Sequence, residues 1–186
     1  MTLRLLAFAA SLRLGSWNRK LLAVAVEIAR ADGAEVDFAE FREFDMPLYD
    51  ADLQGTQGFP PGARLLGERI LAVDGILLAS PEYNFSLPGT LKNAIDWVSR
   101  EKPTPLRGKS AMLLSTSTGL VGGNRGLWAL RIPLESLGVH VYPDMFSLAQ
   151  GDKAFDAAGQ IIEPVVRERL AKMVHGYLRV ATALAG

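Results

Sequence analysis

The chain has 186 residues, of which 49% are hydrophobic and 22% charged, a size and composition typical of one globular domain spanning residues 1–186. Twenty basic and twenty acidic side chains give a formal net charge of zero, which argues against nucleic acid as a partner. With no cysteine and only two histidines, the chain cannot form disulfides or use a thiolate nucleophile, and we expect no metal site.

Short apolar segments alternate with longer amphipathic segments along the chain. The short segments predict strands at residues 3–9, 36–41, 75–79, 111–114 and 139–142. Helical spacing of apolar residues predicts helices from Trp17 to just before Gly33, from Leu65 to Val73, over 88–99, after Gly123 and from Pro164 onward. This alternation, with continuous rather than alternating apolar strands, predicts an α/β fold in which helices cover both faces of a five-stranded, doubly wound parallel sheet.

Two segments interrupt this regular pattern. Residues 45–62 are rich in glycine and proline and predict one long irregular loop, a kind of segment that usually has a function or forms a contact. Pro133 falls inside the helix predicted after Gly123, where its missing N–H predicts a bend or an early end of that helix.

The amino-terminal segment imitates a signal peptide, because Arg4 precedes a short apolar run that ends in small residues. The run is too short for such a peptide, and a buried first strand explains it better. No stretch approaches the roughly 18 consecutive apolar residues of a membrane span. We therefore expect a cytoplasmic protein that does not use a membrane.

The loops that follow the strands are the expected ligand sites, since open parallel sheets bind ligands beyond the carboxyl ends of their strands. The first, residues 11–18, places hydroxyls, an amide and Arg13 at the start of a helix, where N–H groups and the helix dipole favour a phosphate. The alternative is an ordinary helix cap by Ser16 or Asn18 with a solvated Arg13. Neither the dinucleotide nor the nucleoside triphosphate glycine motif is present.

Two further loops are expected at the same edge of the sheet. Residues 80–89 combine two aromatics with two prolines, which suits the wall of a site for a flat ligand, although Tyr83 and Phe85 could instead fold into the core. Residues 115–125 contain hydroxyls and three glycines, which allow a ligand to approach the backbone closely, although a flexible linker has the same composition. Together the three loops predict a site for a phosphate and a planar ring.

Four stretches carry a resemblance to a known family: SLRLGSWNRKLL (11–22), MPLYDADL (46–53), PEYNFSLPGTLKNAIDW (81–97) and STGLVGGNR (117–125). They resemble the NADPH-dependent FMN reductases, flavodoxin-like flavoproteins that include bacterial quinone, azo-dye and chromate reductases. The resemblance implies the strand order 2-1-3-4-5. It also implies an enzyme that takes a hydride from NADPH or NADH through bound FMN and reduces quinones, azo compounds or free flavin.

The resemblance also implies roles for individual residues. Those that would hold the FMN phosphate are Ser11, Arg13, Ser16 and Asn18. Those that would border the isoalloxazine and ribityl chain are Pro81, Glu82, Tyr83, Asn84 and Phe85. Those that would line the other side of the ring are Ser115, Ser117, Thr118, Gly119, Gly122 and Gly123. Arg125 would lie near the nicotinamide nucleotide or at a subunit contact.

No side chain is expected to be catalytic, because the flavin carries the chemistry. The resemblance further implies a homodimer or homotetramer, with residues 49–53 at a dimer interface beside the flavin, and a small-molecule electron acceptor. The alternatives are a flavodoxin-type carrier of single electrons and a non-catalytic flavin-binding sensor. Because such carriers are usually strongly acidic around the flavin, the zero net charge favours the reductase.

Overall fold

The computed structural model, which describes residues 2–186, has a fully parallel sheet at its centre. Its strands are β1 (Arg4–Ala9), β2 (Glu35–Ala39), β3 (Gly75–Ala79), β4 (Ser110–Thr116), β5 (His140–Val141) and β6 (Phe146–Leu148). They lie in the order β2-β1-β3-β4-β5, and β6 also pairs with β4. β3 and β4 are buried along their whole length, as strands covered on both faces must be.

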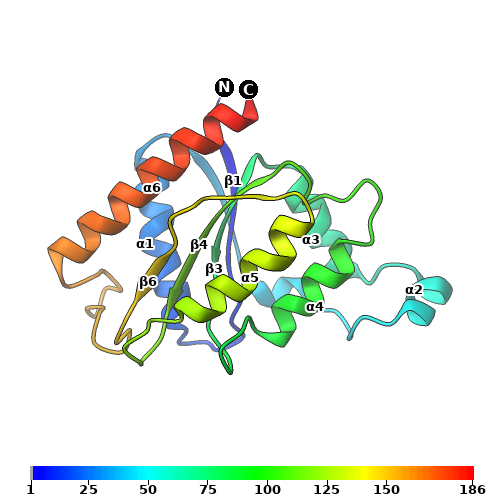
Figure 1. The fold of residues 1–186 in the computed structure, drawn as a ribbon, viewed down its shortest axis with the longest axis horizontal. Helices are drawn as coiled ribbons and strands as arrows, with labels where there is room; N and C mark the ends of the chain where they lie inside the picture. The colour runs from blue at the N-terminus through cyan, green and yellow to red at the C-terminus, as the bar shows by residue number, and fades with distance from the viewer. Residues whose placement is uncertain (1) are drawn as a thin grey trace.

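Helices cover both faces of the sheet (Figure 1). They are α1 (Trp17–Ala31), α2 (Ala51–Gln57), α3 (Pro61–Leu71), α4 (Gly89–Val98), α5 (Asn124–Ser136) and α6 (Pro164–Ala185), with a 3-10 helix η1 (Phe41–Phe44). α1 and α6 pack on one face, and α3, α4 and α5 pack on the other. The strand order and the three layers confirm the predicted doubly wound, flavodoxin-like fold.

The fifth strand position differs from the prediction because it is divided in two. β5 pairs with the start of β4, at Ser110 and Ala111, whereas β6 pairs with its end, from Leu114 to Thr116. Pro143 lies between the two pieces and has no N–H to give to the ladder. The predicted strand 139–142 is therefore only the first half of the edge of the sheet, and its continuation was missed.

The structure corrects two predictions about irregular segments. The segment 45–62 contains α2, whose start is capped by the Asp50 carboxylate accepting from the N–H groups of Asp52 (2.8 Å) and Leu53 (3.3 Å). No residue of α2 is buried, and the helix projects from the body of the molecule (Figure 1). Of the two effects predicted for Pro133, a bend or an early end of α5, the early end is wrong, because the helix continues to Ser136.

Smaller differences affect the ends of elements. The second strand ends at Ala39 rather than at Phe41, which belongs to η1. α3 begins at Pro61, in the first-turn position that suits proline, and ends at Leu71 rather than at Val73. α6 begins at Pro164, as predicted. Among residues 2–186, no helix is both long and apolar enough to span a bilayer.

A buried polar contact crosses the core between β3, β4 and α6. The Tyr177 hydroxyl lies 3.1 Å from Ser110 Oγ and donates to the carbonyl of Ile76 at 3.3 Å. Its complete burial raises the pKa of the Tyr177 phenol, so the group stays neutral. Gly75 makes room for this contact, because a Cβ there would lie 2.4 Å from both Ser110 Oγ and Tyr177 Oη.

Replacing Gly75 with alanine should therefore destabilise the fold. We expect Gly75→Ala to lower the free energy of unfolding by about 1–3 kcal/mol, the usual cost of overpacking a core, as measured by urea denaturation. Gly55→Ala is the matched control: its added Cβ would meet no atom within 4 Å in the exposed helix α2. Equal unfolding midpoints for Gly75→Ala and the unsubstituted protein would contradict this account.

Glu101 predicts a pH dependence of stability. Burial, followed by the negative charge of Glu68, raises the pKa of the Glu101 carboxyl, and its buried Oε1 has no hydrogen-bond partner within residues 2–186. A raised folded-state pKa means that the fold holds this proton more tightly than the unfolded chain, so the group costs stability as pH rises above about 4.5.

Glu101→Gln removes this charge and should make the protein more stable than the unsubstituted chain at pH 7 but not at pH 4, in urea titrations at both values. The exposed Glu168→Gln controls for the loss of a carboxylate in general. A Glu101→Gln difference that is the same at both pH values would show that burial of the charge is not its cause.

Candidate functional site

Three loops meet at the carboxyl edge of the sheet, the lower edge in Figure 1. Parallel pairing sets Ala9 of β1 beside Ala79 of β3, and Ala79 beside Leu114 of β4. Two hydrogen bonds continue this pairing into the loops: Ala10 N–H donates to the Ala79 carbonyl at 2.8 Å, and Ser80 N–H donates to the Leu114 carbonyl at 2.9 Å. The expectation that the three loops share one edge is confirmed.

The first loop wraps over the start of α1. Ser16 is the N-cap of the helix, and its hydroxyl accepts from Arg19 N–H at 3.3 Å. Ser11 Oγ accepts from Arg13 N–H at 3.4 Å, and the exposed Arg13 guanidinium donates to the Gly15 carbonyl at 2.8 Å. The structure therefore places Ser11, Arg13 and Ser16 around one helix start, where the first backbone N–H groups have no acceptor within the helix.

Asn18 has a different environment from the other three candidate phosphate ligands. Its side chain is buried, and its carboxamide pairs with the backbone of Thr116: Nδ2 donates to the carbonyl at 2.9 Å, and Oδ1 accepts from the N–H at 3.0 Å. The amide thus extends the hydrogen bonding of β4 to α1. One Nδ2 hydrogen is left for another acceptor.

The second loop is a tight hairpin that projects into solvent. Tyr83 and Ser86 exchange two backbone hydrogen bonds of 3.0 Å. The two residues at its tip, Asn84 and Phe85, have φ values of 50° and 67°, a left-handed conformation that costs a residue with a Cβ about 1–2 kcal/mol. Tyr83 and Phe85 are 53% and 67% exposed, so the alternative in which these rings fold into the core is wrong.

A buried carboxylate holds the hairpin to the third loop. Glu82 Oε1 accepts from Arg125 Nε at 2.8 Å, and Oε2 accepts from the N–H of Gly126, in the first turn of α5, at 3.0 Å. The Arg125 guanidinium also lies 3.7 Å from the centre of the Phe85 ring. Arg125 is therefore bound within its own chain to the second loop, at the edge where the three loops meet.

The third loop depends on close backbone packing. A Cβ on Gly123 would lie 2.0 Å from Ser115 Oγ, and one on Gly122 would lie 2.7 Å from the carbonyl carbon of Leu148. Both glycines have left-handed φ values, 84° and 64°. Ser115 itself is buried and donates to the Ser80 carbonyl at 2.7 Å, so it joins the second and third loops from beneath.

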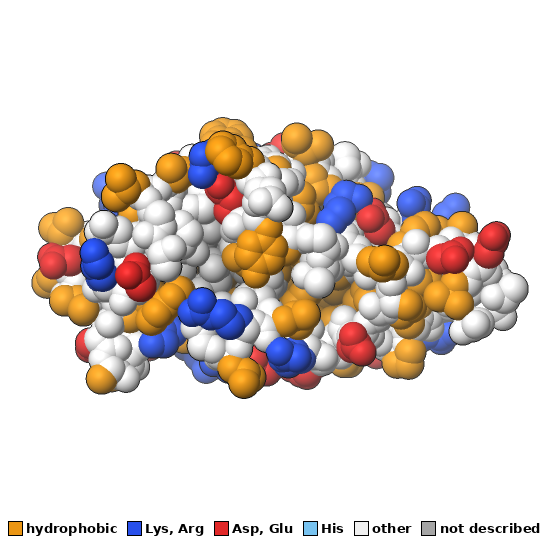
Figure 2. Space-filling view, turned by 90° about the horizontal axis from the view of Figure 1, so that it is seen from below, with side chains coloured by type: hydrophobic (Ala, Val, Ile, Leu, Met, Phe, Trp, Pro, Cys, Tyr) orange, Lys and Arg blue, Asp and Glu red, His pale blue; other side chains and the backbone are white. Residues whose placement is uncertain are grey.

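The sixteen residues predicted for the site thus fall into two groups. Those exposed or partly exposed along the edge are Ser11, Arg13, Tyr83, Asn84, Phe85, Ser117, Thr118, Gly119 and Arg125. The others hold the loops in place or lie beneath them: Ser16, Asn18, Pro81, Glu82, Ser115, Gly122 and Gly123. Figure 2 looks directly onto this edge.

Asn93 and Trp97 were not predicted to have a role, yet they hold the segment before α2 against α4. Asn93 donates to the Pro47 carbonyl at 2.9 Å and accepts from Tyr49 N–H at 2.8 Å, and Trp97 Nε1 donates to the same carbonyl at 2.8 Å. Their spacing of four residues on one helix was the available signal, because it places an amide and an indole N–H on the same face.

FMN can be tested against these residues by its chemistry. Its phosphate needs donors, which the start of α1, Ser11 and Arg13 provide. A Cβ at Gly15 would meet no atom within 4 Å, so there is open space beside that helix start. Its ring needs flat, stiff surroundings, which the hairpin at 83–86 and the glycine-rich loop at 117–123 provide. The residues present fit the group.

Comparison with known proteins finds similar sequences among reductases. The chain is 36% identical over 174 residues to an NAD(P)H-dependent FMN reductase of Pseudomonas aeruginosa, covering 92% of this chain and 91% of the relative. It is 39% identical over 163 residues to a quinone reductase of Escherichia coli, covering 87% of this chain and 86% of that one.

Solved structures similar to this chain include a flavoenzyme and a flavodoxin. The flavoenzyme NAD(P)H:acceptor oxidoreductase FerB of Paracoccus denitrificans superposes with a TM-score of 0.85 at 28% identity, covering 98% of both chains. A flavodoxin of Bacillus cereus, at 14% identity and a TM-score of 0.60, shares the fold. The model of the NADPH-dependent FMN reductase family matches residues 3–153. The chain therefore belongs to the NADPH-dependent FMN reductase family.

Proposed function

We propose that the protein is an FMN-dependent NAD(P)H oxidoreductase whose acceptors are quinones and similar flat oxidants. The observation that carries the proposal is the meeting of three loops at one sheet edge, where the start of α1, with Ser11 and Arg13 beside it, lies next to two stiff, partly exposed loops. The relatives named as FMN and quinone reductases support the same activity. Azo compounds and free flavin are further acceptors of the proposed class.

Each loop has its own part in holding FMN under this proposal. Ser11, Arg13, Ser16 and the start of α1 bind the phosphate through charge-assisted hydrogen bonds. Asn18 contributes its remaining Nδ2 hydrogen and fixes α1 to β4.

The ring then lies between the other two loops. The residues proposed to border one side are Pro81, Glu82, Tyr83, Asn84 and Phe85, and those proposed for the other side are Ser115, Ser117, Thr118, Gly119, Gly122 and Gly123.

When bound, FMN supplies the hydride acceptor and the electron donor that the protein's own side chains lack. The chain's residues orient the reactants. The Glu82–Arg125 pair fixes the hairpin against α5, so that Tyr83 and Phe85 keep one position beside the ring. Arg125 keeps its exposed guanidinium edge toward the nicotinamide nucleotide or a neighbouring subunit. No nucleophilic side chain is required, because the flavin carries the redox chemistry.

We further propose a homodimer or homotetramer in which a second copy covers residues 49–53, at the start of α2 and just before it. Leu48 is 81% exposed, and α2 buries none of its residues within its own chain. An acceptor bound at the flavin would then lie close to both subunits. We propose a cytoplasmic protein with a small-molecule acceptor and no nucleic-acid partner, in keeping with its zero net charge.

The phosphate assignment predicts the effect of removing Arg13. A charge-assisted hydrogen bond contributes about 1.5–3 kcal/mol, so Arg13→Ala should raise the Kd for FMN about 10- to 100-fold in a flavin-fluorescence titration. Arg30→Ala is the matched control: Arg30 also donates to a backbone carbonyl, that of Val36 at 2.8 Å, but at the opposite end of the sheet. An unchanged Kd for Arg13→Ala would place the phosphate elsewhere.

Anaerobic titration of the FMN-loaded protein with NADPH or NADH tests the function itself. A reductase loses its visible flavin absorbance on mixing with at least one of the two nucleotides, and the absorbance returns on addition of a quinone. If FMN binds but neither nucleotide bleaches it, the protein is a single-electron carrier or a flavin sensor instead.

A further inference from the structure

Two adjoining cavities border the loop that follows β1. The first, which we call the basic cavity, has a volume of about 360 Å³ between the ends of β1 and β2 and is lined by Ser11, Arg13, Arg19, Glu40 and Arg42 among others. The second, the apolar cavity, has a volume of about 410 Å³ between η1 and the start of α4. The two share Leu12, Phe41 and Arg42 as lining residues, so they form one continuous groove.

Within residues 2–186, two cations of the basic cavity have no carboxylate partner, Arg42 and Arg13. Arg19 is already paired with Glu40, because its Nε and Nη2 each donate to one oxygen of the Glu40 carboxylate. Arg13 is committed to the flavin phosphate under the proposed function. Within residues 2–186 Arg42 has no acidic partner within 4.0 Å, and its guanidinium donates instead to the Leu12 carbonyl, which orients the group without cancelling its charge. The cavity is therefore suited to a further phosphate.

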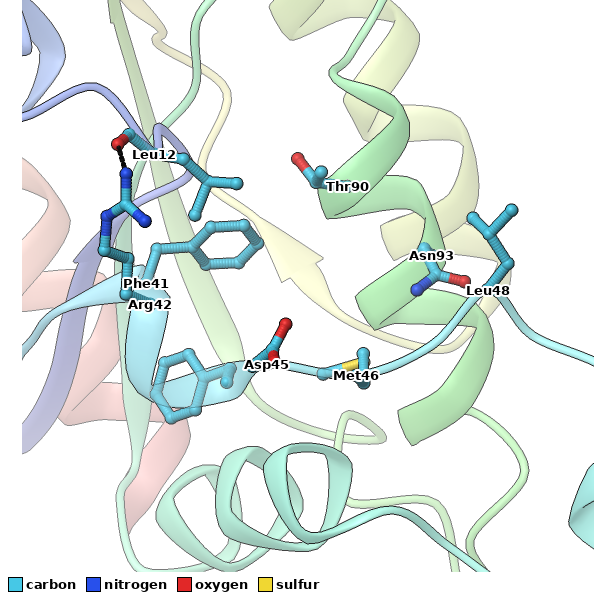
Figure 3. A pocket seen from close by; sticks show the side chains of 9 residues that line it. Leu12, Phe41, Arg42, Asp45, Met46, Leu48, Thr90 and Asn93 are labelled. Carbon is cyan, nitrogen blue, oxygen red and sulfur yellow. Dashed lines mark hydrogen bonds between the residues drawn. The ribbon is translucent and has the colours of Figure 1, made fainter.

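The apolar cavity is suited to a flat aromatic base. Figure 3 shows the Phe41 ring and the Leu12 side chain facing Thr90 across it, with the Asp45 carboxylate at its base. Behind Phe41, the rings of Phe8 and Phe44 pack at centroid distances of 5.9 and 6.4 Å, which makes this wall rigid. Apolar walls with a few polar groups are typical of nucleotide and cofactor sites, and Asp45 is an acceptor for an exocyclic amine.

We propose that this groove binds the adenosine 2′-phosphate end of NADPH, with the adenine in the apolar cavity and the 2′-phosphate on Arg42. The inference rests on the proposed function and adds to it the residue that distinguishes NADPH from NADH. The position of the groove agrees with this proposal. Its lining residues Ser11, Leu12 and Arg13 belong to the loop that is proposed to hold the flavin phosphate. A nucleotide in the groove would therefore lie along the same edge as the flavin, where its nicotinamide must reach the flavin ring.

FMN also combines an aromatic ring with a phosphate monoester, so FMN could occupy the groove in place of the adenosine 2′-phosphate end of NADPH. Calorimetric titration of the FMN-loaded protein with 2′,5′-ADP and with 5′-AMP, beside a separate FMN titration of the apoprotein, distinguishes the two sources. We expect 2′,5′-ADP to bind about 10- to 100-fold more tightly than 5′-AMP, as one charge-assisted phosphate contact implies. Arg42→Ala should reduce this ratio to roughly twofold or less while leaving the Kd for FMN unchanged.

Two further variants sharpen the test. Glu40→Gln releases Arg19 while keeping an amide oxygen as acceptor for the start of η1, and it should tighten 2′,5′-ADP binding without affecting 5′-AMP. Arg30→Ala, at the opposite end of the sheet, should leave both titrations unchanged.

The proposal is overturned if Arg42→Ala binds 2′,5′-ADP as tightly as the unsubstituted protein. It is also overturned if Arg42→Ala raises the Kd for FMN instead, which would assign the groove to the flavin phosphate.

Failure of the proposed function gives a different result. A protein that binds no FMN, or whose flavin neither nucleotide bleaches, is not the proposed reductase, whereas FMN-loaded protein that binds 2′,5′-ADP and 5′-AMP equally overturns only the present inference.

Discussion

Parallel pairing of β1, β3 and β4 is the constraint on which the site depends. Because Ala9, Ala79 and Leu114 lie side by side in the sheet, each of the three following loops begins at the same edge. All three strands are followed by helices, so three helix starts also lie at that edge. Apart from the N–H groups that already donate to Ser16 and Glu82, their first N–H groups make the edge favourable for anions. The proposed phosphate site therefore needs no net positive charge on the chain, only these helix starts and a few arginines.

Buried polar side chains hold the three loops at this edge in fixed positions. Asn18 pairs with both backbone groups of Thr116, Ser115 reaches the Ser80 carbonyl, and Glu82 binds the start of α5. Each of these groups is satisfied by backbone or by an opposite charge, as buried polar groups must be to avoid a large desolvation cost. Their effect is to hold loops that carry strain, above all the left-handed Phe85, in one conformation.

The sequence predicted the structure correctly where a residue pattern is compatible with only one kind of structure. Apolar strands alternating with amphipathic helices led to the correct layers, and the three loops after β1, β3 and β4 were correctly expected to meet at one edge. Patterns with several meanings were less informative. β6 is a short strand beyond Pro143, too brief for a periodic signal, and α2 is a helix without a buried face, so no apolar spacing marks it.

Contacts between distant residues were beyond the reach of sequence patterns. The spacing of Asn93 and Trp97 places both on one face of α4, but no sequence pattern identifies their partners, the Pro47 carbonyl and the Tyr49 N–H.

The central claim is that the three loops hold FMN with its phosphate at the start of α1. A crystal structure of the FMN complex tests it most directly: we predict the phosphate in contact with Arg13 and Ser16 and the ring against residues 83–86. A flavin phosphate bound away from the start of α1 would contradict the account.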